Sequence, residues 1–216
     1  MKKVALISLG CEKNLVDSEM ILGFVRKGQV EIINNINEAD IIIINTCGFI
    51  ESAKEEAINT IIDSLKYKEK GVKIVVTGCL AQRYLDVLKE EIPEVDLWIP
   101  IRDYYKFGDL FKNIINDSKY CNKGLQMEER LISTPKHLAY VRISDGCNNR
   151  CTYCAIPLIR GNFKSRNIED IVLEVKNLIK DGRKEICLIS QDLTNYGYDI
   201  NTNLESLLKE ILKIDN

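Results

Sequence analysis

The chain has 216 residues, 45% of them hydrophobic and 29% charged, with a formal net charge of −2. These values are typical of a globular chain of one or two domains, and they give no electrostatic argument for binding to nucleic acid or to a membrane surface. No apolar run reaches the ~18 residues of a membrane span, and the stretch after Met1 breaks at Gly10 without a signal-peptide cleavage site. We therefore expect a cytoplasmic protein without a membrane partner. The eight cysteines of such a chain are more typical of metal binding or catalysis than of disulfides.

Strands and helices alternate in the first part of the chain. Apolar, β-branched runs predict buried parallel strands at 4–8, 41–44 and 72–77, with a fourth strand at 95–99. Helices are expected over 14–26, from Ser52 onward, over 81–91 and over 107–115. Ser52 and Glu55 form a capping-box pattern at the start of the second helix. The alternation predicts an α/β fold in which helices cover both faces of a parallel sheet.

A cysteine follows each of the first three predicted strands, namely Cys11, Cys47 and Cys79. Ligands of open parallel α/β sheets bind at the carboxyl ends of the strands. We therefore expect these three thiols to meet in space, although they lie far apart in the sequence. A lone cysteine is most often a small buried core residue, and this is the alternative interpretation. Three cysteines at the same structural position favour a shared metal cluster.

A polar, irregular stretch at 117–136 predicts a linker, so domains are expected at 1–116 and 137–216. In the second domain we expect strands at 137–143 and 185–189, a helix over 168–180 ended by Gly182, and a last helix from a Thr202–Glu205 capping box to Ile214. Cys187 is interpreted as a core residue, and Cys121 in the linker has no evident partner.

A third group of cysteines, Cys147, Cys151 and Cys154, follows the first strand of this domain with C-x3-C-x2-C spacing. Iron–sulfur clusters that only carry electrons use four thiolates. Three thiolates can hold three irons of a four-iron, four-sulfur cube and leave the fourth iron open for a substrate or cofactor. A structural zinc site is the alternative, but it needs four closed ligands, commonly in C-x2-C pairs. Chance clustering among eight cysteines is a third interpretation.

Several motifs together resemble one family. The loop 147–154 resembles the cluster loop of radical S-adenosylmethionine (SAM) enzymes, and 9–19, 45–54 and 77–82 are similar to the N-terminal cysteine motifs of the methylthiotransferases. Segments 160–166 and 190–197 are similar to barrel segments of the same family. The chain is thus identified as a member of the radical SAM methylthiotransferases. Segments 10–18 and 47–54 are most similar to the RimO-like branch, the ribosomal protein aspartate methylthiotransferases.

The resemblance implies a fold, two kinds of cofactor and a reaction. The fold is an N-terminal parallel-sheet α/β methylthiotransferase domain followed by the first βα units of a radical SAM partial TIM-type barrel. The cofactors are two 4Fe-4S clusters and SAM, with Cys147, Cys151 and Cys154 holding the radical SAM cluster and Cys11, Cys47 and Cys79 holding the second. A 5′-deoxyadenosyl radical takes a hydrogen from the target carbon, so no side chain is assigned a catalytic role.

The resemblance also implies where SAM binds. Tyr153 is expected against the adenine, with packing behind the loop as the alternative. Gln191 and Asp192 follow a barrel strand at the end that carries function, with helix capping as their alternative role. Arg166 and Arg160 are expected to meet the charges of SAM or substrate, with surface solvation as the alternative.

The implied substrate is one aspartate, modified at its β-carbon, in the twelfth protein of the small ribosomal subunit, and the other implied partner is a reducing electron donor. About 250 residues make a full eight-unit barrel, and residues 136–216 have room for about two units. We therefore expect a C-terminally truncated chain without the β-barrel (TRAM) domain and without turnover of its own. A tRNA adenosine substrate and a non-catalytic iron–sulfur-binding fragment are the alternative functions.

Overall fold

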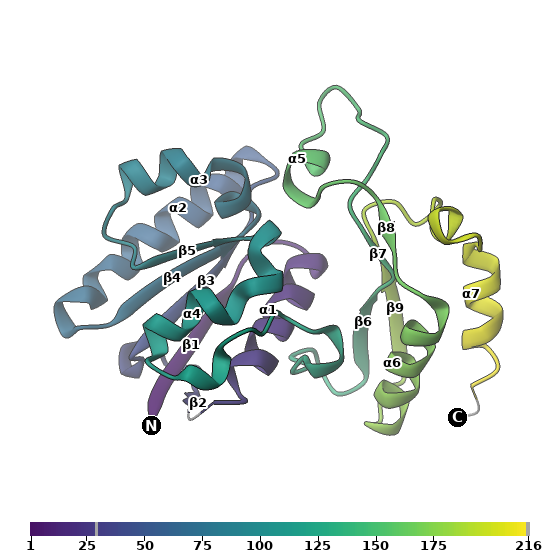
Figure 1. The fold of residues 1–216 in the computed structure, drawn as a ribbon, viewed down its shortest axis with the longest axis horizontal. Helices are drawn as coiled ribbons and strands as arrows, with labels where there is room; N and C mark the ends of the chain where they lie inside the picture. The colour runs from purple at the N-terminus through teal and green to yellow at the C-terminus, as the bar shows by residue number, and fades with distance from the viewer. Residues whose placement is uncertain (29, 215–216) are drawn as a thin grey trace. The chain divides into compact units, whose positions relative to one another are not determined.

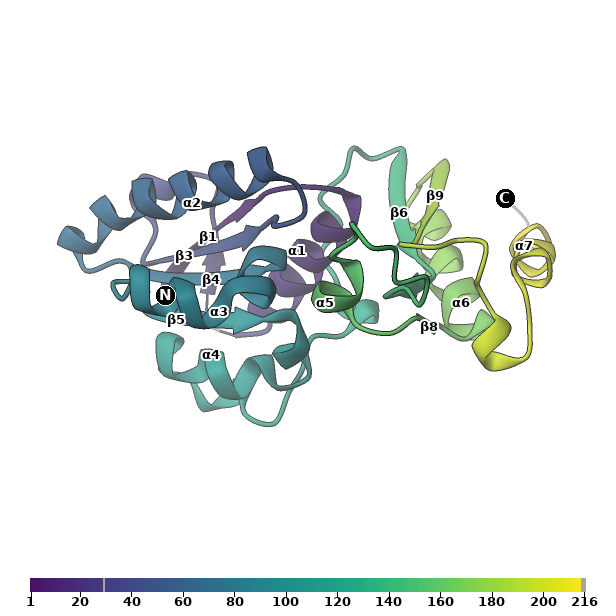
Figure 2. The same cartoon turned by 90° about the horizontal axis from the view of Figure 1, so that it is seen from above.

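The computed structural model describes residues 1–28 and 30–214 and divides into two compact units. The first unit is Met1–Leu131 and the second is Ile132–Asn216 (Figure 1). The first unit contains one sheet of five strands, drawn from two sides in Figure 1 and Figure 2, and the second unit contains two sheets of two strands. Each unit has its own hydrophobic core.

The first unit contains a five-stranded parallel sheet of order β2-β1-β3-β4-β5. Its strands are β1 (Lys2–Ser8), β2 (Val30–Ile32), β3 (Ile41–Thr46), β4 (Lys73–Gly78) and β5 (Leu97–Pro100). Four of them occur where the apolar runs predict strands. The three-residue edge strand β2 was not predicted, because so short a segment shows no periodicity.

Helices cover both faces of this sheet, as expected. They are α1 (Glu12–Val25), α2 (Glu51–Leu65), α3 (Cys79–Glu91) and α4 (Phe107–Ile115). The side chains of β3 alternate between the faces. Ile42 and Ile44 pack with α2 and α3 in one cluster, while Ile41 and Ile43 are buried on the opposite face, which α1 and α4 cover (Figure 1).

The two predicted capping boxes are wrong in their position. Helix α2 begins at Glu51, one residue before Ser52, and no side chain caps it; Glu51 instead pairs with Lys54. Helix α7 (Leu204–Ile211) has Asn203 as its N-cap, and the side-chain oxygen of Asn203 accepts a hydrogen bond of 2.9 Å from the backbone N–H of Ser206. Asparagine is at least as good an N-cap as threonine, and the helix uses the residue after the expected Thr202.

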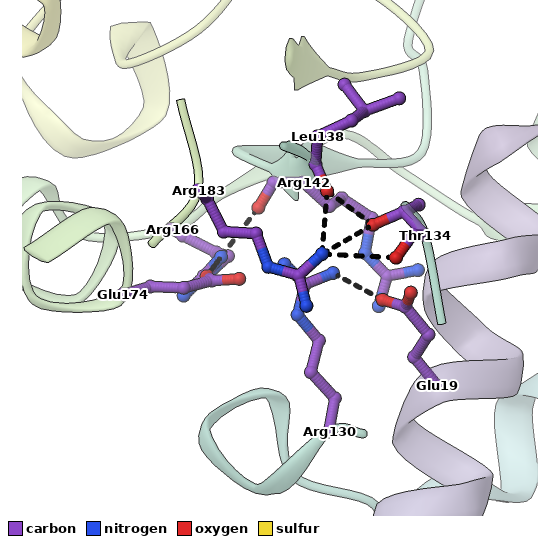
Figure 3. Close-up of polar contacts among 8 residues, drawn as sticks. All are labelled: Glu19, Arg130, Thr134, Leu138, Arg142, Arg166, Glu174 and Arg183. Carbon is purple, nitrogen blue, oxygen red and sulfur yellow. Dashed lines mark hydrogen bonds and ion pairs between the residues drawn. The ribbon is translucent and has the colours of Figure 1, made fainter. Parts of the chain in front are cut away.

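Residues 117–131, expected as linker, belong to the first compact unit. Tyr120 is buried there, its ring packs on Phe24, and its hydroxyl donates to the carbonyl of Val25 at 2.7 Å. Burial raises the pKa of Tyr120 to about 12. Arg130 forms an ion pair of 3.1 Å with Glu19, and both side chains are almost completely buried (Figure 3). These contacts hold the segment on α1 and extend the unit beyond the expected boundary at residue 116.

The second unit is built on a parallel pair of strands, β6 (Leu138–Arg142) and β9 (Glu185–Ile189), joined through α6 (Ile168–Lys180). Their core includes Val141, Ile171 and Val175 together with Leu207 from α7. Two-residue strands β7 (Ser144–Asp145) and β8 (Lys164–Ser165) pair antiparallel, and α5 (Ile156–Arg160) lies between them in the sequence. The β6–α6–β9 unit is the expected beginning of a barrel.

The start of the second unit is fixed by one arginine. The guanidinium of Arg183 donates to the carbonyls of Thr134, Pro135 and Leu138 at 2.8–3.1 Å; Figure 3 draws its bonds to Thr134 and Leu138.

Short 3-10 helices occupy Ile36–Glu38, Lys66–Lys70, Ile101–Lys106, Ser118–Tyr120, Met127–Glu129 and Tyr198–Ile200. Among the residues that the structure describes, no helix has the length and apolar character needed to cross a membrane.

Candidate metal centres

The first three cysteines lie at one edge of the five-stranded sheet, as the strand pattern predicts. Cys11 is the N-cap of α1, Cys47 directly follows β3, and Cys79 is the first residue of α3 after β4. Strands β1, β3 and β4 are neighbours in register, with Ser8 opposite Asn45 and Thr46 opposite Gly78. The three parallel strands therefore place all three cysteines at the same edge of the sheet, where the carboxyl ends of these strands lie.

Two glycines allow the three cysteine segments to approach each other closely. A Cβ at Gly10 would lie 2.8 Å from the Cβ of Cys47 and 3.1 Å from its sulfur. A Cβ at Gly48 would lie 2.8 Å from the backbone nitrogen of Leu80 and 3.1 Å from the carbonyl carbon of Cys79. Real side chains do not fit at such distances, so glycine is required where these backbones meet. The Cys11 loop thus touches Cys47, and the Cys47 loop touches Cys79.

One asparagine connects all three segments. The side-chain nitrogen of Asn14 donates to the carbonyls of Leu9 and Thr46, at 3.1 and 2.8 Å. Its side-chain oxygen accepts from the thiol of Cys79 at 3.1 Å. Accessibility falls along the trio, since Cys11 is exposed, Cys47 is half-buried and Cys79 is buried. The trio therefore combines thiols that a metal can reach with a rigid polar support beneath them.

Both trios consist of cysteines alone, so the donors that they offer are thiolates. As the described residues stand, no group of three or more His, Cys, Asp or Glu side chains is arranged to hold a metal ion. Thiolates are the usual ligands of iron–sulfur clusters, whereas a structural zinc site closes four ligands around a single ion.

The second trio lies on a loop that follows β7. Gly146 has φ of +76°, and a Cβ there would lie 2.2 Å from the carbonyl oxygen of Asn162. The side-chain oxygen of Asn148 accepts from the backbone N–H of Phe163 at 3.0 Å, and the N–H of Cys147 donates to the carbonyl of Gly161 at 3.3 Å. The loop is therefore tied to the segment before β8.

The thiols of this loop are accessible. Cys151 is exposed, Cys147 and Cys154 are half-buried, and the N–H of Cys154 donates to the carbonyl of Cys151 at 3.0 Å. The loop is thus a short, braced segment that presents three thiols without burying any of them. Cys121 and Cys187, outside both trios, are half-buried. Cys187 was expected in the core, but it is not among the core residues of the second unit.

The residues expected to contact SAM have different surroundings. Tyr153 is 87% exposed, which is unlike a residue packed behind the loop. The side-chain oxygen of Gln191 is buried and accepts no hydrogen bond from the described residues. A buried polar atom of this kind is rare and needs a partner. Gln191 therefore has a vacant acceptor that a cationic or N–H group could satisfy.

Asp192 is a hydrogen-bond acceptor for its own loop and for the cysteine loop. Thr194 and Asn195 donate to its carboxylate, and so does the side chain of Asn149, at 2.9 Å, from between Cys147 and Cys151. The hydrogen bond from Thr194 is the largest cause that lowers the pKa of Asp192; burial opposes it, and Asn195 and Asn149 add to the lowering. The loop after β9 thus holds the cysteine loop through one charged acceptor.

Both candidate arginines have protein partners. Arg166 donates to Glu174 at 2.6 Å and to the carbonyl of Arg142 at 2.7 Å (Figure 3). The side chain of Arg160 is 2% exposed and lies 3.7 Å from the carboxylate of Asp145. Surface solvation, the alternative weighed from the sequence, does not describe either guanidinium.

Sequence reasoning missed Asn14 and Asn149 as parts of these centres. Each lies within three residues of a cysteine, and this proximity is the only signal that the sequence gives. Amide side chains near metal ligands are common in loops and turns without any such role.

Two families match the chain. Residues 3–100 match the family described as "Uncharacterized protein family UPF0004", and residues 141–215 match the "Radical SAM superfamily". The two matches divide the chain much as its compact units do.

Curated relatives at about half identity cover nearly the whole chain. The ribosomal protein uS12 methylthiotransferase RimO of Clostridium botulinum is 49% identical over 99% of this chain and 50% of its own length. The protein of the same name from Caldicellulosiruptor saccharolyticus is 47% identical over 100% of this chain and 52% of its own length. The one from Clostridium perfringens is 50% identical over 99% of this chain and 50% of its own length. The chain spans about half the length of these relatives.

Solved structures share the fold at low identity. The cobalamin-dependent SAM radical enzyme OxsB, with aqua-cobalamin and SAM bound, has a TM-score of 0.62 and 16% identity and covers 100% of this chain and 38% of its own. The radical SAM methyltransferase TsrM of Kitasatospora setae, with its tryptophan substrate and a SAM analogue bound, has a TM-score of 0.63 and 13% identity. The match covers 99% of this chain and 51% of the TsrM chain. Both likenesses concern the fold alone.

Proposed function

We propose a function from one premise: this chain belongs to the radical SAM methylthiotransferases, in the branch of the ribosomal protein uS12 enzymes. It forms part of a transferase that adds a methylthio group to the β-carbon of an aspartate in uS12, the twelfth protein of the small ribosomal subunit. A reducing electron donor is its second partner, and a cytoplasmic location agrees with a ribosomal substrate.

Six cysteines hold two 4Fe-4S clusters in this proposal. Cys147, Cys151 and Cys154 hold one, and Cys11, Cys47 and Cys79 hold the other. Three thiolates per cube leave one iron open, and a bound radical SAM cluster supplies the electron for reductive cleavage of SAM. The convergence of three strand-end cysteines at one sheet edge supports the N-terminal cluster.

The residues near the C-x3-C-x2-C loop bind and orient SAM. The vacant, buried acceptor of Gln191 suits the ammonium group of SAM. The exposed ring of Tyr153 is free to cover the adenine. Asp192 and Arg166 contribute through the loops that they hold, since Asp192 accepts from Asn149 and Arg166 donates to Glu174. A direct bond from Arg166 to SAM would compete with the ion pair to Glu174.

The observation that carries this proposal is the pair of thiol trios in a chain that belongs to this family. Its test uses the complete gene product that contains these residues, reconstituted anaerobically with iron and sulfide. We expect 5′-deoxyadenosine to form from SAM, and a methylthio group to appear on a peptide that contains the target aspartate of uS12.

An anticodon stem-loop in place of the peptide separates the two substrates. Modification of the stem-loop and not of the peptide would overturn the ribosomal assignment and favour a tRNA adenosine methylthiotransferase. Iron loading without SAM cleavage would overturn the enzymatic assignment and favour an iron–sulfur-binding protein without this activity.

A further inference from the structure

We infer that Asn14 is a positioning residue for the N-terminal thiol trio: its side chain holds the three cysteine segments in place in the iron-free chain, where Cys79 still carries its proton. The inference rests on the proposed function of Cys11, Cys47 and Cys79 as ligands. It adds a residue that binds no metal and acts through the three segments that carry the thiols.

The contacts of one amide group reach all three segments. The Nδ2 of Asn14 donates to the carbonyl of Leu9 at 3.1 Å, two residues before Cys11, and to the carbonyl of Thr46 at 2.8 Å, one residue before Cys47. The Oδ1 accepts from the sulfur of Cys79 at 3.1 Å. The two carbonyl acceptors fix which end of the amide is the nitrogen, because an amide oxygen facing two carbonyls would be repelled.

Asn14 is itself held firmly. Its side chain is 0% exposed, and its backbone carbonyl accepts from the side chain of Asn45 at 2.8 Å. Asn45 also donates to the hydroxyl of Ser18, which donates to the hydroxyl of Ser8, at 2.8 and 2.7 Å. This network, buried except at Ser8, connects the start of α1 with the ends of β1 and β3. Its three hydrogen bonds restrict the local arrangement of the backbone, although the Oδ1 of Asn45 accepts no hydrogen bond from the described residues.

The position of Asn14 explains why an amide is needed there. The carbonyls of Leu9 and Thr46 require a donor, and the thiol of Cys79 requires an acceptor until it loses its proton to bind iron. Among side chains of this size, an amide offers both in a rigid plane. An aspartate has the same shape but would turn a second oxygen toward the two carbonyls. An alanine would leave all three groups without this partner.

The test isolates the N-terminal trio. In a chain with Cys147, Cys151 and Cys154 all changed to alanine, Asn14→Asp and Asn14→Ala are compared with the unchanged residue. The matched controls are Asn113→Asp and Asn113→Ala, at an exposed asparagine of α4 in the same unit. Iron and sulfide per chain and the rate at which a chelator removes the iron are measured after anaerobic reconstitution.

With Asn14 present we expect about four irons per chain, the content of one four-iron cluster. Residues behind metal ligands typically contribute roughly 10- to 100-fold to metal affinity. We therefore expect the chelator to remove iron about tenfold faster or more from both Asn14 variants, and at an unchanged rate from both Asn113 variants. Equal rates in the Asn14 and Asn113 variants would overturn the role of Asn14.

An iron-free measurement on the unchanged chain does not depend on the variants folding. The two side-chain amide protons of Asn14, followed by NMR, should exchange with solvent far more slowly than those of Asn113, because Asn14 is buried and its amide nitrogen donates to two carbonyls. Exchange as fast as at Asn113 would contradict the inference. If instead Asn14 is protected but the trio binds no iron even with Asn14 intact, the proposed cluster is wrong, which is a different failure.

Discussion

Gly10 is the residue whose replacement tests the closeness of the N-terminal trio most simply. Its φ is +94°, and a Cβ there would lie 2.8 Å from the Cβ of Cys47. We expect Gly10→Ala to lower the free energy of unfolding by about 1–3 kcal/mol through the strained backbone, with the overlap adding to this. Iron bound by the first trio should fall as well, because the Cys11 loop must move away from Cys47. Denaturant unfolding and an iron assay measure the two effects.

Gly71 provides the matched control for Gly10. Its φ is also positive, +80°, but a Cβ there would meet no atom within 4 Å. Gly71→Ala should therefore cost only the backbone part, about 1–2 kcal/mol, and leave the iron content unchanged. If Gly10→Ala behaves like Gly71→Ala in both assays, the loops are not as close as the structure places them.

A change at Tyr153 should affect SAM binding without affecting the stability of the fold. Its ring is 87% exposed between Cys151 and Cys154, so little packing is lost on its removal. We expect Tyr153→Ala to change the free energy of unfolding by no more than about 0.5 kcal/mol and to weaken SAM binding to the reconstituted protein, measured by equilibrium dialysis. Unchanged SAM affinity would remove Tyr153 from the proposed SAM site.

The link between the cysteine loop and the loop after β9 is a property of two elements. Asn149 donates to Asp192 at 2.9 Å, and Thr194 donates to the same carboxylate at 2.7 Å. In Asp192→Ala these bonds are lost, and backbone amides of residues 146–155 should exchange about tenfold faster or more, since a tenfold change corresponds to about 1.4 kcal/mol. The exposed Asp170→Ala on α6 is the control. Equal exchange in the two variants would show that Asp192 does not hold the loop.

Asp96 connects three elements of the first unit and gives it a pH dependence. Its carboxylate accepts from Lys68 at 2.7 Å and from Lys73 and the N–H of Ile74 at 2.9 Å. Burial opposes the charged form, but these donors outweigh it and keep the pKa of Asp96 below its ordinary value. The folded pKa is thus lower than the unfolded one. The stabilisation is present above the unfolded pKa and is lost as the pH falls through the folded pKa.

Asp96→Asn should therefore destabilise the first unit at pH 7 by roughly 1.5–3 kcal/mol. The difference from the unchanged chain should shrink as the pH falls below about 4. Urea unfolding followed by the fluorescence of Trp98, the single tryptophan and a buried residue of β5, reports on this unit. Asp63→Asn, at an exposed position of α2, is the control and should show neither effect. A difference that stays constant with pH would contradict the role of Asp96.

The sequence predicted elements better than their ends and their polar contacts. Long apolar runs such as Ile41–Thr46 are visible in any window, and so are β6, α6 and β9 in order. Edge strand β2 has three residues and no pattern. Caps depend on which of two adjacent polar residues the chain uses, as with Thr202 and Asn203. The contact of Asn149 with Asp192 spans 43 positions of the sequence, and no local pattern encodes it.

At the scale of the whole chain, two compact units each present one trio of thiols. The placement of the trios could be predicted because strand ends and a short loop fix where cysteines go. The support of the trios could not be predicted. Gly10 and Gly48 act through close backbone approaches, and Asn14 acts through side-chain hydrogen bonds, all of which only the folded chain creates. Each unit matches one family, and single curated relatives match the chain across both units. The chain spans about half the length of these relatives.

The iron content of cysteine variants tests the central claim most directly. After anaerobic reconstitution we expect about eight irons per chain, and about four when either trio is changed to alanine. With all six cysteines changed, no iron should bind, whereas Cys121→Ala and Cys187→Ala should leave the content unchanged. An iron content that does not fall when Cys11, Cys47 and Cys79 are replaced would contradict a second cluster at the edge of the sheet.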